Sequence, residues 1–578
     1  MDVYRETKGE DFEGFETWIN AFKMKCKMHS RLLIIPFFLH IVIFALSVNY
    51  TSTYDTTVAT KWAIANTFQS FSYPHFKMNF PNPDGTIVSS NAGIIAHEPW
   101  IRSCAKKELS RIKWNYLKIV TALLLVYPFL IIPFKVRSKK QSNRRYIRGS
   151  QIITREEYLN QLKKNNERVD LPFGSVRMPV SAETKQTFIV GKPGKGKTVL
   201  LSGVLERLRE RQEKAIVYDF KGDYVSQFYD PEVDLIFNPL DARSFGWQVM
   251  DELETRMDID AVSSSLIPPP LQNSNPYWND AARDVFAGIL HYLFQEGFRY
   301  NKDIWSMVTS DTEHIVACLA QTPGGARGLK HIEDINSRTT SGILSVLMQY
   351  AKCFEYMSAN DSDFRIKEWL NNSKGMIFIS NHADVQETLR PILSLFIDLL
   401  ARRLLSSPDN PEFKTFFLLD EFGTLQRLPT IIKLLTLSRS RGGCVFLGIQ
   451  DFGQIDDIYS KENRQTITNA CGNTVAFSLS GDAANIAANT IGPVEYVEIN
   501  KVKSMGVSDY RDGISLNEQK RKELLFLPSD LSNLKDLRGI VRFANYDYIL
   551  SDWNYKEYKI RNEPLILRED LFLRSAED

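Results

Sequence analysis

The residues Gly191-Lys192-Pro193-Gly194-Lys195-Gly196-Lys197-Thr198 fit the pattern G-x-x-x-x-G-K-[ST] of a phosphate-binding loop. An apolar run at 187–190 precedes them, and a helix-like stretch at 198–211 follows. A loop between a strand and a helix can wrap backbone N–H groups round a phosphate, with Lys197 on the β- and γ-phosphates and the Thr198 hydroxyl on Mg²⁺. The strand–loop–helix context favours this interpretation over its plain alternative, a glycine-rich turn.

A second sequence element supplies the carboxylates that such a loop lacks. The apolar run 416–419 ends in Asp420-Glu421. One carboxylate, Asp420, can then help to hold Mg²⁺, and the other, Glu421, can polarise water beside the γ-phosphate. Many strands end in an acidic turn, so this pattern alone is weak evidence. Together with the upstream loop it predicts nucleotide hydrolysis.

Beyond residue 180, apolar runs alternate with helix-period segments. The predicted strands are 187–190, 215–218, 235–237, 376–379, 415–419, 445–449, 475–477 and 540–543, and predicted helices include 385–405 and 428–437. Such alternation indicates an α/β domain with a largely parallel sheet, which binds its ligands at the carboxyl ends of the strands.

One interval breaks this alternation. Between residues 251 and 370 apolar residues recur at helical spacing, in predicted helices at 256–266, 279–295, 303–308, 312–320 and 339–354. We therefore expect an all-α domain inserted in the α/β domain.

Two apolar segments near the N-terminus, 32–48 and 116–134, are about as long as a bilayer crossing requires. His40 and Lys118 are their only basic or acidic residues. Lys and Arg are dense before the first segment and after the second, which predicts that both termini face the cytoplasm and that 49–115 lies outside. Four basic residues at 106–113 disagree with that orientation, although the flank after the second segment is denser in charge.

Composition excludes some classes of function. The 578 residues carry a net charge of only +2, so no overall basic field points to nucleic acid. The six cysteines form no C-x-x-C pair and the eight histidines no H-E-x-x-H motif, which argues against a zinc site and against a membrane-anchored metalloprotease.

These observations predict the following organisation along the chain. It comprises a cytoplasmic segment (1–31), a first membrane helix (32–48), an external region (49–115), a second membrane helix (116–134), a basic flank and linker containing one helix (135–180), the first part of the nucleotide-binding domain (181–250), the all-α domain (251–370), and the second part of the nucleotide-binding domain with a short tail (371–578).

Two residues that follow the acidic pair in the sequence, Arg439 and Gln450, are further candidates for the site. Arg439, after the predicted helix 428–437, could reach the γ-phosphate of a neighbouring subunit, where an inserted arginine stabilises transition-state charge. It could equally be a solvated residue favoured by the helix dipole. Gln450, at the end of the next strand, is placed to sense the γ-phosphate.

Several further motifs occur in an order and spacing that resemble the TraD/TrwB-type coupling proteins of conjugative type IV secretion, and the TraD branch most closely. They are Tyr218-Asp219-Phe220-Lys221-Gly222-Asp223, Phe228-Tyr229-Asp230-Pro231, Asn238-Pro239-Leu240-Asp241-Ala242-Arg243-Ser244, Leu419-Asp420-Glu421-Phe422, Ser440-Arg441-Gly442-Gly443 and Gly448-Ile449-Gln450. The resemblance extends from the two membrane segments to about residue 550.

This resemblance implies a RecA-like P-loop NTPase domain in a homohexameric inner-membrane ATPase that uses ATP and Mg²⁺. It implies that the protein links the relaxase and other relaxosome proteins to the secretion channel proteins and moves single-stranded DNA. By the same analogy Arg439 is the trans-acting finger and Gln450 the sensor. The alternatives are a protein-exporting secretion ATPase, an FtsK-like DNA translocase, and a membrane scaffold that binds nucleotide without hydrolysing it. The intact Lys197 and Glu421 argue against the scaffold.

Overall fold

A computed structural model describes residues 37–38, 40–42, 44–45, 53–141, 145–270, 275–357, 364–372, 374–504 and 513–572. The chain divides into two compact units. The first comprises residues 1–146 and 496–521, and the second comprises residues 147–495 and 522–578.

The first unit contains a small folded domain with its own core. Its elements are α2 (Thr53–Ser70), β1 (Lys77–Pro81), β2 (Ile87–Asn91), α3 (Ala92–His97) and the first turns of α4 (Pro99–Gln141). The strands β1 and β2 form an antiparallel hairpin, and the Trp62 indole donates a hydrogen bond of 3.2 Å to the carbonyl of Ala96. Buried apolar residues from both helices and strands make up the core: Val58, Ala65, Met78, Phe80, Ala92, Ile95, Ala96 and Ile101.

The two predicted membrane segments fall on different parts of this unit. The second, 116–134, lies within the 43-residue helix α4, whose side chains beyond residue 121 are outside the described part. Most of the first, 32–48, also lies outside the described residues. Among the helical residues that the structure describes, none forms a helix both long and apolar enough to cross a bilayer.

The second unit is built on a ten-stranded sheet in the order β4-β17-β16-β13-β7-β12-β11-β8-β10-β9. The seven strands from β13 to β9 pair in parallel, while β16 is antiparallel to both β13 and β17. Its strands are β4 (Ile152–Ile153), β7 (Thr187–Val190), β8 (Lys214–Asp219), β9 (Leu235–Phe237), β10 (Met376–Ser380), β11 (Thr415–Leu419), β12 (Gly443–Ile449), β13 (Asn473–Ala476), β16 (Arg538–Arg542) and β17 (Tyr548–Asp552). The largely parallel sheet predicted from the sequence is confirmed, and β7, β9 and β11 have the predicted bounds.

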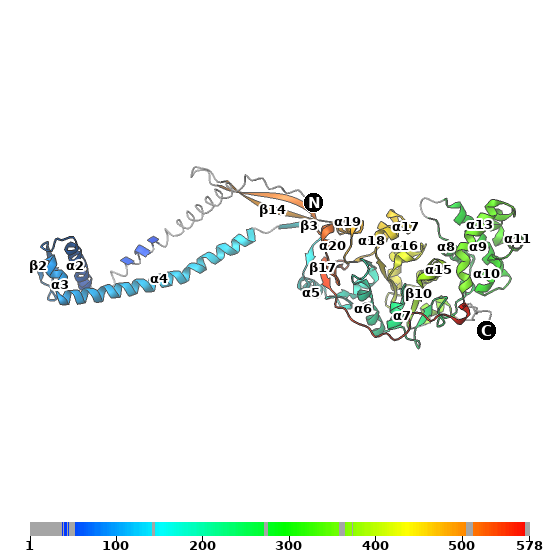
Figure 1. Ribbon diagram of the computed structural model, residues 1–578, viewed down its shortest axis with the longest axis horizontal. Coiled ribbons are helices and arrows are strands. Elements are labelled where there is room, and N and C mark those ends of the chain that lie inside the picture. The colour runs from blue at the N-terminus through cyan, green and yellow to red at the C-terminus, as the bar shows by residue number, and fades with distance from the viewer. Residues whose placement is uncertain are drawn as a thin grey trace. The chain divides into compact units, whose positions relative to one another are not determined.

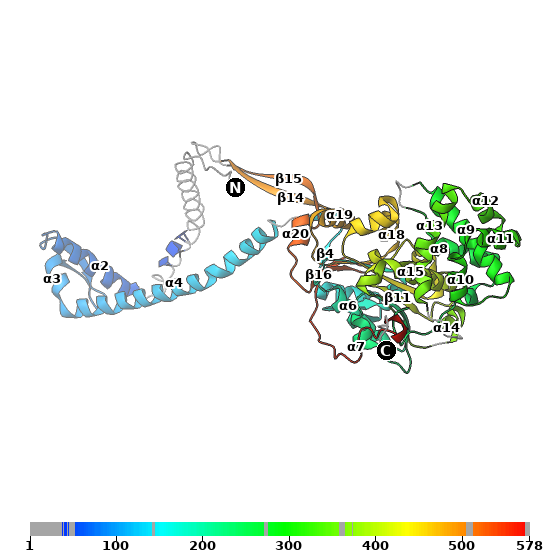
Figure 2. The ribbon, with the colours of Figure 1, turned by 45° about the vertical axis from the view of Figure 1, so that its right-hand side comes forward.

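Helices cover both faces of this sheet (Figures 1 and 2). They are α5 (Arg155–Lys164), α6 (Lys197–Glu210), α7 (Asp223–Phe228), α15 (Gln386–Ser406), α16 (Ile431–Leu437), α17 (Phe452–Tyr459), α18 (Lys461–Ala470), α19 (Gly481–Ile491) and α20 (Pro528–Ser532). Successive residues of a strand point to opposite faces. Accordingly, Phe417 of β11 belongs to the core shared with α15, whereas its neighbour Phe416 belongs to the core shared with α6. Burial on both faces explains why these strands are continuous apolar runs in the sequence.

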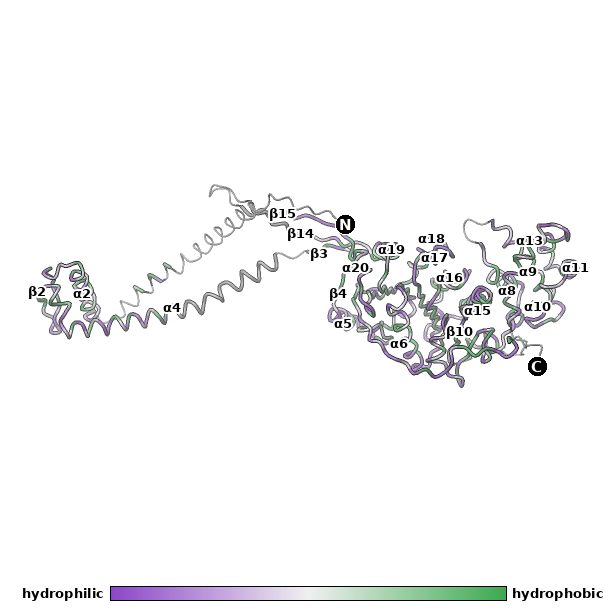
Figure 3. The backbone as a smooth tube through the Cα atoms, viewed as in Figure 1, coloured by the Kyte–Doolittle hydropathy of each residue, from purple (hydrophilic) through white to green (hydrophobic). Residues whose placement is uncertain are grey.

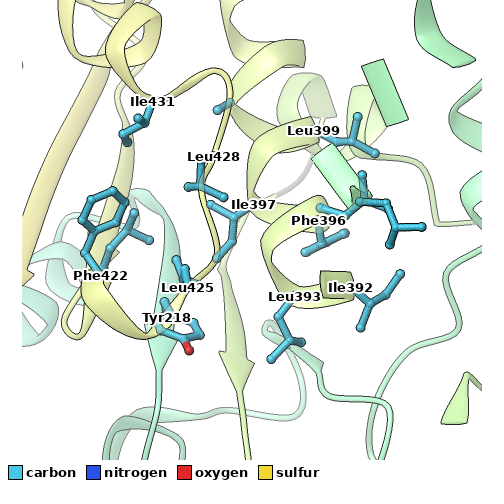
Figure 4. Close-up of a cluster of buried hydrophobic side chains, with 14 of the residues drawn as sticks. Tyr218, Ile392, Leu393, Phe396, Ile397, Leu399, Phe422, Leu425, Leu428 and Ile431 are labelled. Atoms are coloured by element: carbon cyan, nitrogen blue, oxygen red, sulfur yellow. The ribbon is translucent and has the colours of Figure 1, made fainter. Parts of the chain in front are cut away.

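The core on the α15 side extends over the loop that follows β11. Ile397 of α15 lies beside Leu425 and Leu428 of this loop (Figure 4), and these three side chains are at most 3% exposed. Truncating a buried side chain of this kind to alanine typically costs about 2–5 kcal/mol. Packing of this loop thus fixes the chain just after Asp420 and Glu421.

Between β9 and β10 every described element is helical (green in Figure 1). The α-helices are α8 (Arg256–Leu266), α9 (Tyr277–Gln295), α10 (Asn301–Val308), α11 (Thr312–Ala320), α12 (Ala326–Ile332), α13 (Arg338–Ala351) and α14 (Ile366–Asn372). Hydrophobic and hydrophilic residues alternate along them (Figure 3), as amphipathic helices require. α8 and α11 have the predicted bounds, whereas α12 and α14, each of seven residues, were not predicted because they are too short for a clear period.

The predicted linker before the nucleotide-binding domain is a folded part of that domain. Its predicted helix is α5, with a capping box between Thr154 and Glu157. The prediction of a linker was wrong for the residues that follow, because β5 (Val169–Phe173) and β6 (Val176–Pro179) form a hairpin that buries Leu171 and Phe173. The pattern was missed because polar residues and prolines interrupt these strands.

One long hairpin also escaped prediction. Strands β14 (Pro493–Ser504) and β15 (Gly513–Leu524) form a three-stranded sheet with β3 (Arg145–Gly149), in the order β15-β14-β3. Charged residues such as Glu495, Lys520 and Arg521 recur along the hairpin, so its sequence lacks the apolar pattern of a strand in a core.

Candidate nucleotide-binding site

The glycine-rich loop joins β7 to α6 and has the backbone that its glycines allow. Gly194 and Gly196 have φ angles of 73° and 127°, which residues with a Cβ rarely adopt. A Cβ on Gly191 or Gly196 would also fall 2.6 or 2.8 Å from atoms of Phe477. The Phe477 side chain therefore packs directly against the loop and leaves no room for larger residues at these two positions.

Lys197 begins α6 and is only 6% exposed. Its ammonium group donates a hydrogen bond of 2.8 Å to the carbonyl of Gly191 at the start of the loop. Burial lowers the pKa of Lys197, and the nearby Glu421 and Asp420 oppose that shift. The lysine thus closes the loop on itself with its charge directed into the site.

Two acids follow β11, and each has one carboxylate oxygen held and one free. The Tyr224 hydroxyl donates to Asp420 Oδ2 at 2.9 Å, and the Gln450 amide donates to Glu421 Oε2 at 2.6 Å. The other oxygens, Asp420 Oδ1 and Glu421 Oε1, are buried and have no hydrogen-bond partner among the residues that the structure describes. A buried acceptor without a partner is costly, so these two atoms indicate a missing ligand.

The pKa shifts of Asp420 and Glu421 also indicate a ligand at these carboxylates. Burial raises the pKa of both Asp420 and Glu421, while the hydrogen bonds from Tyr224 and Gln450 and the charge of Lys197 pull in the opposite direction. A divalent cation would supply the positive charge that these carboxylates lack. Carboxylate and hydroxyl oxygens are the ligands that Mg²⁺ prefers, so Asp420 and Thr198 fit that ion.

The loop and the acids face one cavity of about 380 Å³. Its lining includes the predicted site residues Pro193, Gly194, Gly196, Lys197, Thr198, Asp420, Glu421 and Gln450. It also includes Val199, Asp219, Phe220, Lys221, Asp223, Asp536, Leu537 and Tyr555, for which the sequence suggested no role.

Three predicted loop residues do not line the cavity. Gly191 packs against Phe477, and the Lys192 amide donates to the Ser478 carbonyl at 3.1 Å. Lys195 forms a 2.5 Å ion pair with Asp536. These three residues hold the loop in place from its outer side.

Arg439, the predicted finger, does not lie at the cavity of its own chain. It belongs to the 3-10 turn Ser438–Arg441, which directly precedes β12, and its side chain is exposed. Because β12 is parallel to β7, the start of β12 is at the opposite edge of the sheet from the loop that follows β7. Arg439 is absent from the lining of the cavity formed by its own chain. Its neighbour Arg441 is tied to its own chain through the Ser407 carbonyl, at 3.0 Å.

Two residues that sequence reasoning did not assign to the site support it. Tyr224 holds Asp420, and Asp219 accepts the backbone N–H groups of Gly222 (3.0 Å) and Val225 (2.8 Å), which fixes the turn before α7. The motif at 218–223 was noted for its resemblance, but only the fold shows that it places Tyr224 beside the acids.

A glycine-rich loop between a strand and a helix, facing two buried acids at the carboxyl edge of a mostly parallel sheet, defines the class of P-loop nucleotide-binding proteins. Within that class, residues 170–548 match the model of the type IV secretion-system coupling protein DNA-binding domain. The chain belongs to this family. The resemblance to TraD/TrwB-type coupling proteins seen in the sequence is confirmed.

Similar proteins agree with this assignment. The coupling protein TraD of Escherichia coli (strain K12) is 28% identical over 467 residues, which cover 78% of this chain and 64% of TraD. The plasmid coupling protein TrwB in complex with ADP and Mg²⁺ superposes with a TM-score of 0.64 at 23% identity, over 74% of this chain and 98% of that chain. TrwB in complex with the non-hydrolysable ATP analogue ADPNP gives a TM-score of 0.63 at 23% identity, over 73% and 98%. The solved structures share the fold of this chain.

Proposed function

We propose that this chain is the ATP-driven coupling protein of a conjugative type IV secretion system, which moves single-stranded DNA with its attached relaxase to the secretion channel. Membership of the coupling-protein family and the match to its DNA-binding domain model support this proposal. The observation that carries the ATPase part concerns Asp420 and Glu421, which line the cavity together with Lys197: each has a buried carboxylate oxygen, Oδ1 and Oε1 respectively, without a hydrogen-bond partner among the described residues.

The residues of the cavity divide the work of hydrolysis among them. Lys197 neutralises phosphate charge, and Thr198 and Asp420 hold Mg²⁺, which supplies further charge neutralisation when bound. Glu421 orients the attacking water through the oxygen that Gln450 leaves free. Gln450 in turn reports on the γ-phosphate through its bond to Glu421.

Assembly would complete this site. The strand order β13-β7-β12-β11-β8 puts one strand between the loop strand and the acid strand, which supports a RecA-like domain. Arg439 is exposed at the opposite edge of the sheet from its own loop, which supports a role outside the site of its own chain. We propose a homohexamer in which Arg439 is the trans-acting finger.

The place of the protein in the cell follows from the same proposal. Segments 32–48 and 116–134 would cross the inner membrane, with both termini in the cytoplasm and 49–115 outside. The all-α block would then lie in the cytoplasm with the nucleotide-binding domain. The partners of the protein would be relaxosome proteins and the channel proteins, which would receive the DNA.

ATPase activity of the purified full-length chain tests this proposal. Activity per subunit should rise with protein concentration, because the site needs a neighbour, and single-stranded DNA should stimulate it further. Lys197→Ala should abolish both hydrolysis and conjugative DNA transfer. Transfer persisting in that variant would contradict a motor role, and full activity in a strictly monomeric sample would contradict the shared site. Stimulation by a protein substrate but not by DNA would favour a protein-exporting ATPase.

A further inference from the structure

The last described stretch of the chain contributes one residue, Tyr555, to the lining of the nucleotide cavity. After β17, residues 553–572, here called the strap, run past α6 and α7 (dark red in Figures 1 and 2). Tyr555 of the strap lines the cavity, and its side chain is 71% exposed. Tyr555 thus exposes a large aromatic side chain to solvent beside the phosphate-binding loop.

The sheet register places Tyr555 on the side of the loop away from the acids. β11, which leads to Asp420, is separated from β7 by β12. β16 and β17 lie on the other side of β7, beyond β13, and the pair Arg538↔Asp552 sits at the same sheet edge as the loop. Tyr555 follows shortly after Asp552. The cavity is therefore lined by Asp420 and Glu421 on one side of the loop and by Tyr555, with Asp536 and Leu537, on the other.

The side of the cavity that Tyr555 lines is attached to the loop by a chain of backbone hydrogen bonds. The Leu537 N–H donates to the Lys195 carbonyl at 3.2 Å, and the Trp553 N–H donates to the Leu537 carbonyl at 2.7 Å. The buried Trp553 ring lies 4.7 Å from the ring of Phe477, which itself packs against Gly191 and Gly196. The start of the strap is thus fixed relative to the loop.

The strap is also held beyond Tyr555. The Tyr558 hydroxyl donates to Glu206 of α6 at 3.2 Å, and Lys556 pairs with the same carboxylate. Further along, the Arg561 N–H donates to the Ser226 carbonyl at 2.8 Å. With contacts on both sides of it, Tyr555 keeps its place at the cavity although its own side chain is exposed.

We propose that Tyr555 is the platform on which the base of the bound nucleotide stacks, an inference that rests on the proposed function. Phosphates held by Lys197 and directed at the acids leave the nucleoside on the opposite side of the loop, where the Tyr555 ring offers a flat apolar face. Stacking uses the π-face common to all bases. The site therefore discriminates little between adenine and guanine nucleotides.

Binding measurements on the full-length chain separate the base from the phosphates. The ligands are a non-hydrolysable ATP analogue with Mg²⁺ and, as a base-free probe, inorganic tripolyphosphate with Mg²⁺. Loss of one stacking contact typically weakens binding about 5- to 150-fold. Tyr555→Ala should weaken binding of the ATP analogue by a factor in that range and leave tripolyphosphate binding unchanged. Tyr555→Phe keeps the ring and should bind both ligands as the wild type does.

Two control variants make the outcomes distinct. Ile560 is a strap residue that is 72% exposed and does not line the cavity, so Ile560→Ala should leave both affinities unchanged. Lys197→Ala should weaken both ligands, because it acts at the phosphates. Unchanged affinity for the ATP analogue in Tyr555→Ala, or an equal loss for tripolyphosphate, would overturn the stacking role alone. Failure of the wild type to bind either ligand would instead overturn the proposed function.

Discussion

Gln450 donates a 2.6 Å hydrogen bond to one carboxylate oxygen of Glu421, while the other oxygen of that carboxylate is buried without a partner in the described part of the chain. The two residues follow neighbouring parallel strands, β12 and β11. The bond holds the carboxylate of Glu421 in one orientation beside the cavity that this residue lines. This geometry suits a group that positions a water molecule and has to be in place before the nucleotide arrives.

The first prediction concerns that carboxylate. Glu421→Gln should still bind MgATP, since Lys197 and Asp420 remain, but should hydrolyse it about 10²- to 10⁴-fold more slowly, the usual effect of losing a positioned general base. Single-turnover hydrolysis and equilibrium binding measured on the same sample would show the separation. Normal turnover in this variant would mean that another group orients the water.

The second prediction concerns the support of Asp420. Tyr224→Phe removes the hydroxyl that donates to Asp420 Oδ2 and leaves that oxygen, like Oδ1, without a hydrogen-bond partner in the part of the chain that the structure describes. Losing a partner of a buried acceptor costs about 1–3 kcal/mol, so the variant should unfold at lower denaturant concentration when no nucleotide is present. Tyr555→Phe is the matched control because the Tyr555 side chain is exposed, and it should unfold as the wild type does. Equal stability of the two variants would contradict the importance of this bond.

The third prediction concerns a buried carboxylate between the helical block and the sheet. Asp398 of α15 accepts hydrogen bonds from the Ser265 hydroxyl (2.5 Å) and from the Thr430 N–H (2.8 Å). Burial raises the pKa of Asp398 in the folded protein above its usual 3.8, although these bonds oppose the shift. The folded protein therefore keeps a proton that the unfolded chain releases, and stability should fall as the pH rises from about 4 through the raised pKa.

Asp398→Asn tests this because asparagine does not titrate. The difference in free energy of unfolding between wild type and variant should shrink as the pH rises through that window, and then stay constant. Denaturant unfolding at a series of pH values measures it. A difference that is independent of pH would show that the pKa of Asp398 is the same in the folded protein and in the unfolded chain, and it would contradict the raised pKa.

The sequence predicted those parts of the fold whose burial is uniform. β7, β9 and β11 are covered on both faces, so each is an unbroken apolar run with clear ends. The hairpins β5-β6 and β14-β15 were missed because polar residues and prolines break their pattern. Within the site, the loop and the acidic pair follow directly from motifs. Tyr224 and Tyr555 do not, because only the strand order brings residues from α7 and from the strap to the loop.

The final prediction concerns Arg439, the proposed trans-acting finger. Arg439→Ala should lower ATP hydrolysis about 10³- to 10⁵-fold while nucleotide binding persists, the usual effect of losing an arginine finger. Arg441→Ala is the control, since Arg441 is bonded within its own chain, and it should retain hydrolysis.

Mixing two inactive variants then shows whether Arg439 acts between subunits. In a mixed oligomer, an Arg439→Ala subunit keeps its own loop and acids, and a neighbouring Lys197→Ala subunit keeps its Arg439. Each such interface joins an intact loop to an intact arginine, so the mixture should hydrolyse ATP although neither variant does so alone. Activity should rise as subunits exchange and reach a maximum near equal amounts. If the mixture stays inactive under conditions where labelled subunits are seen to exchange, Arg439 does not serve the neighbouring site, and its exposed position is that of a solvated residue.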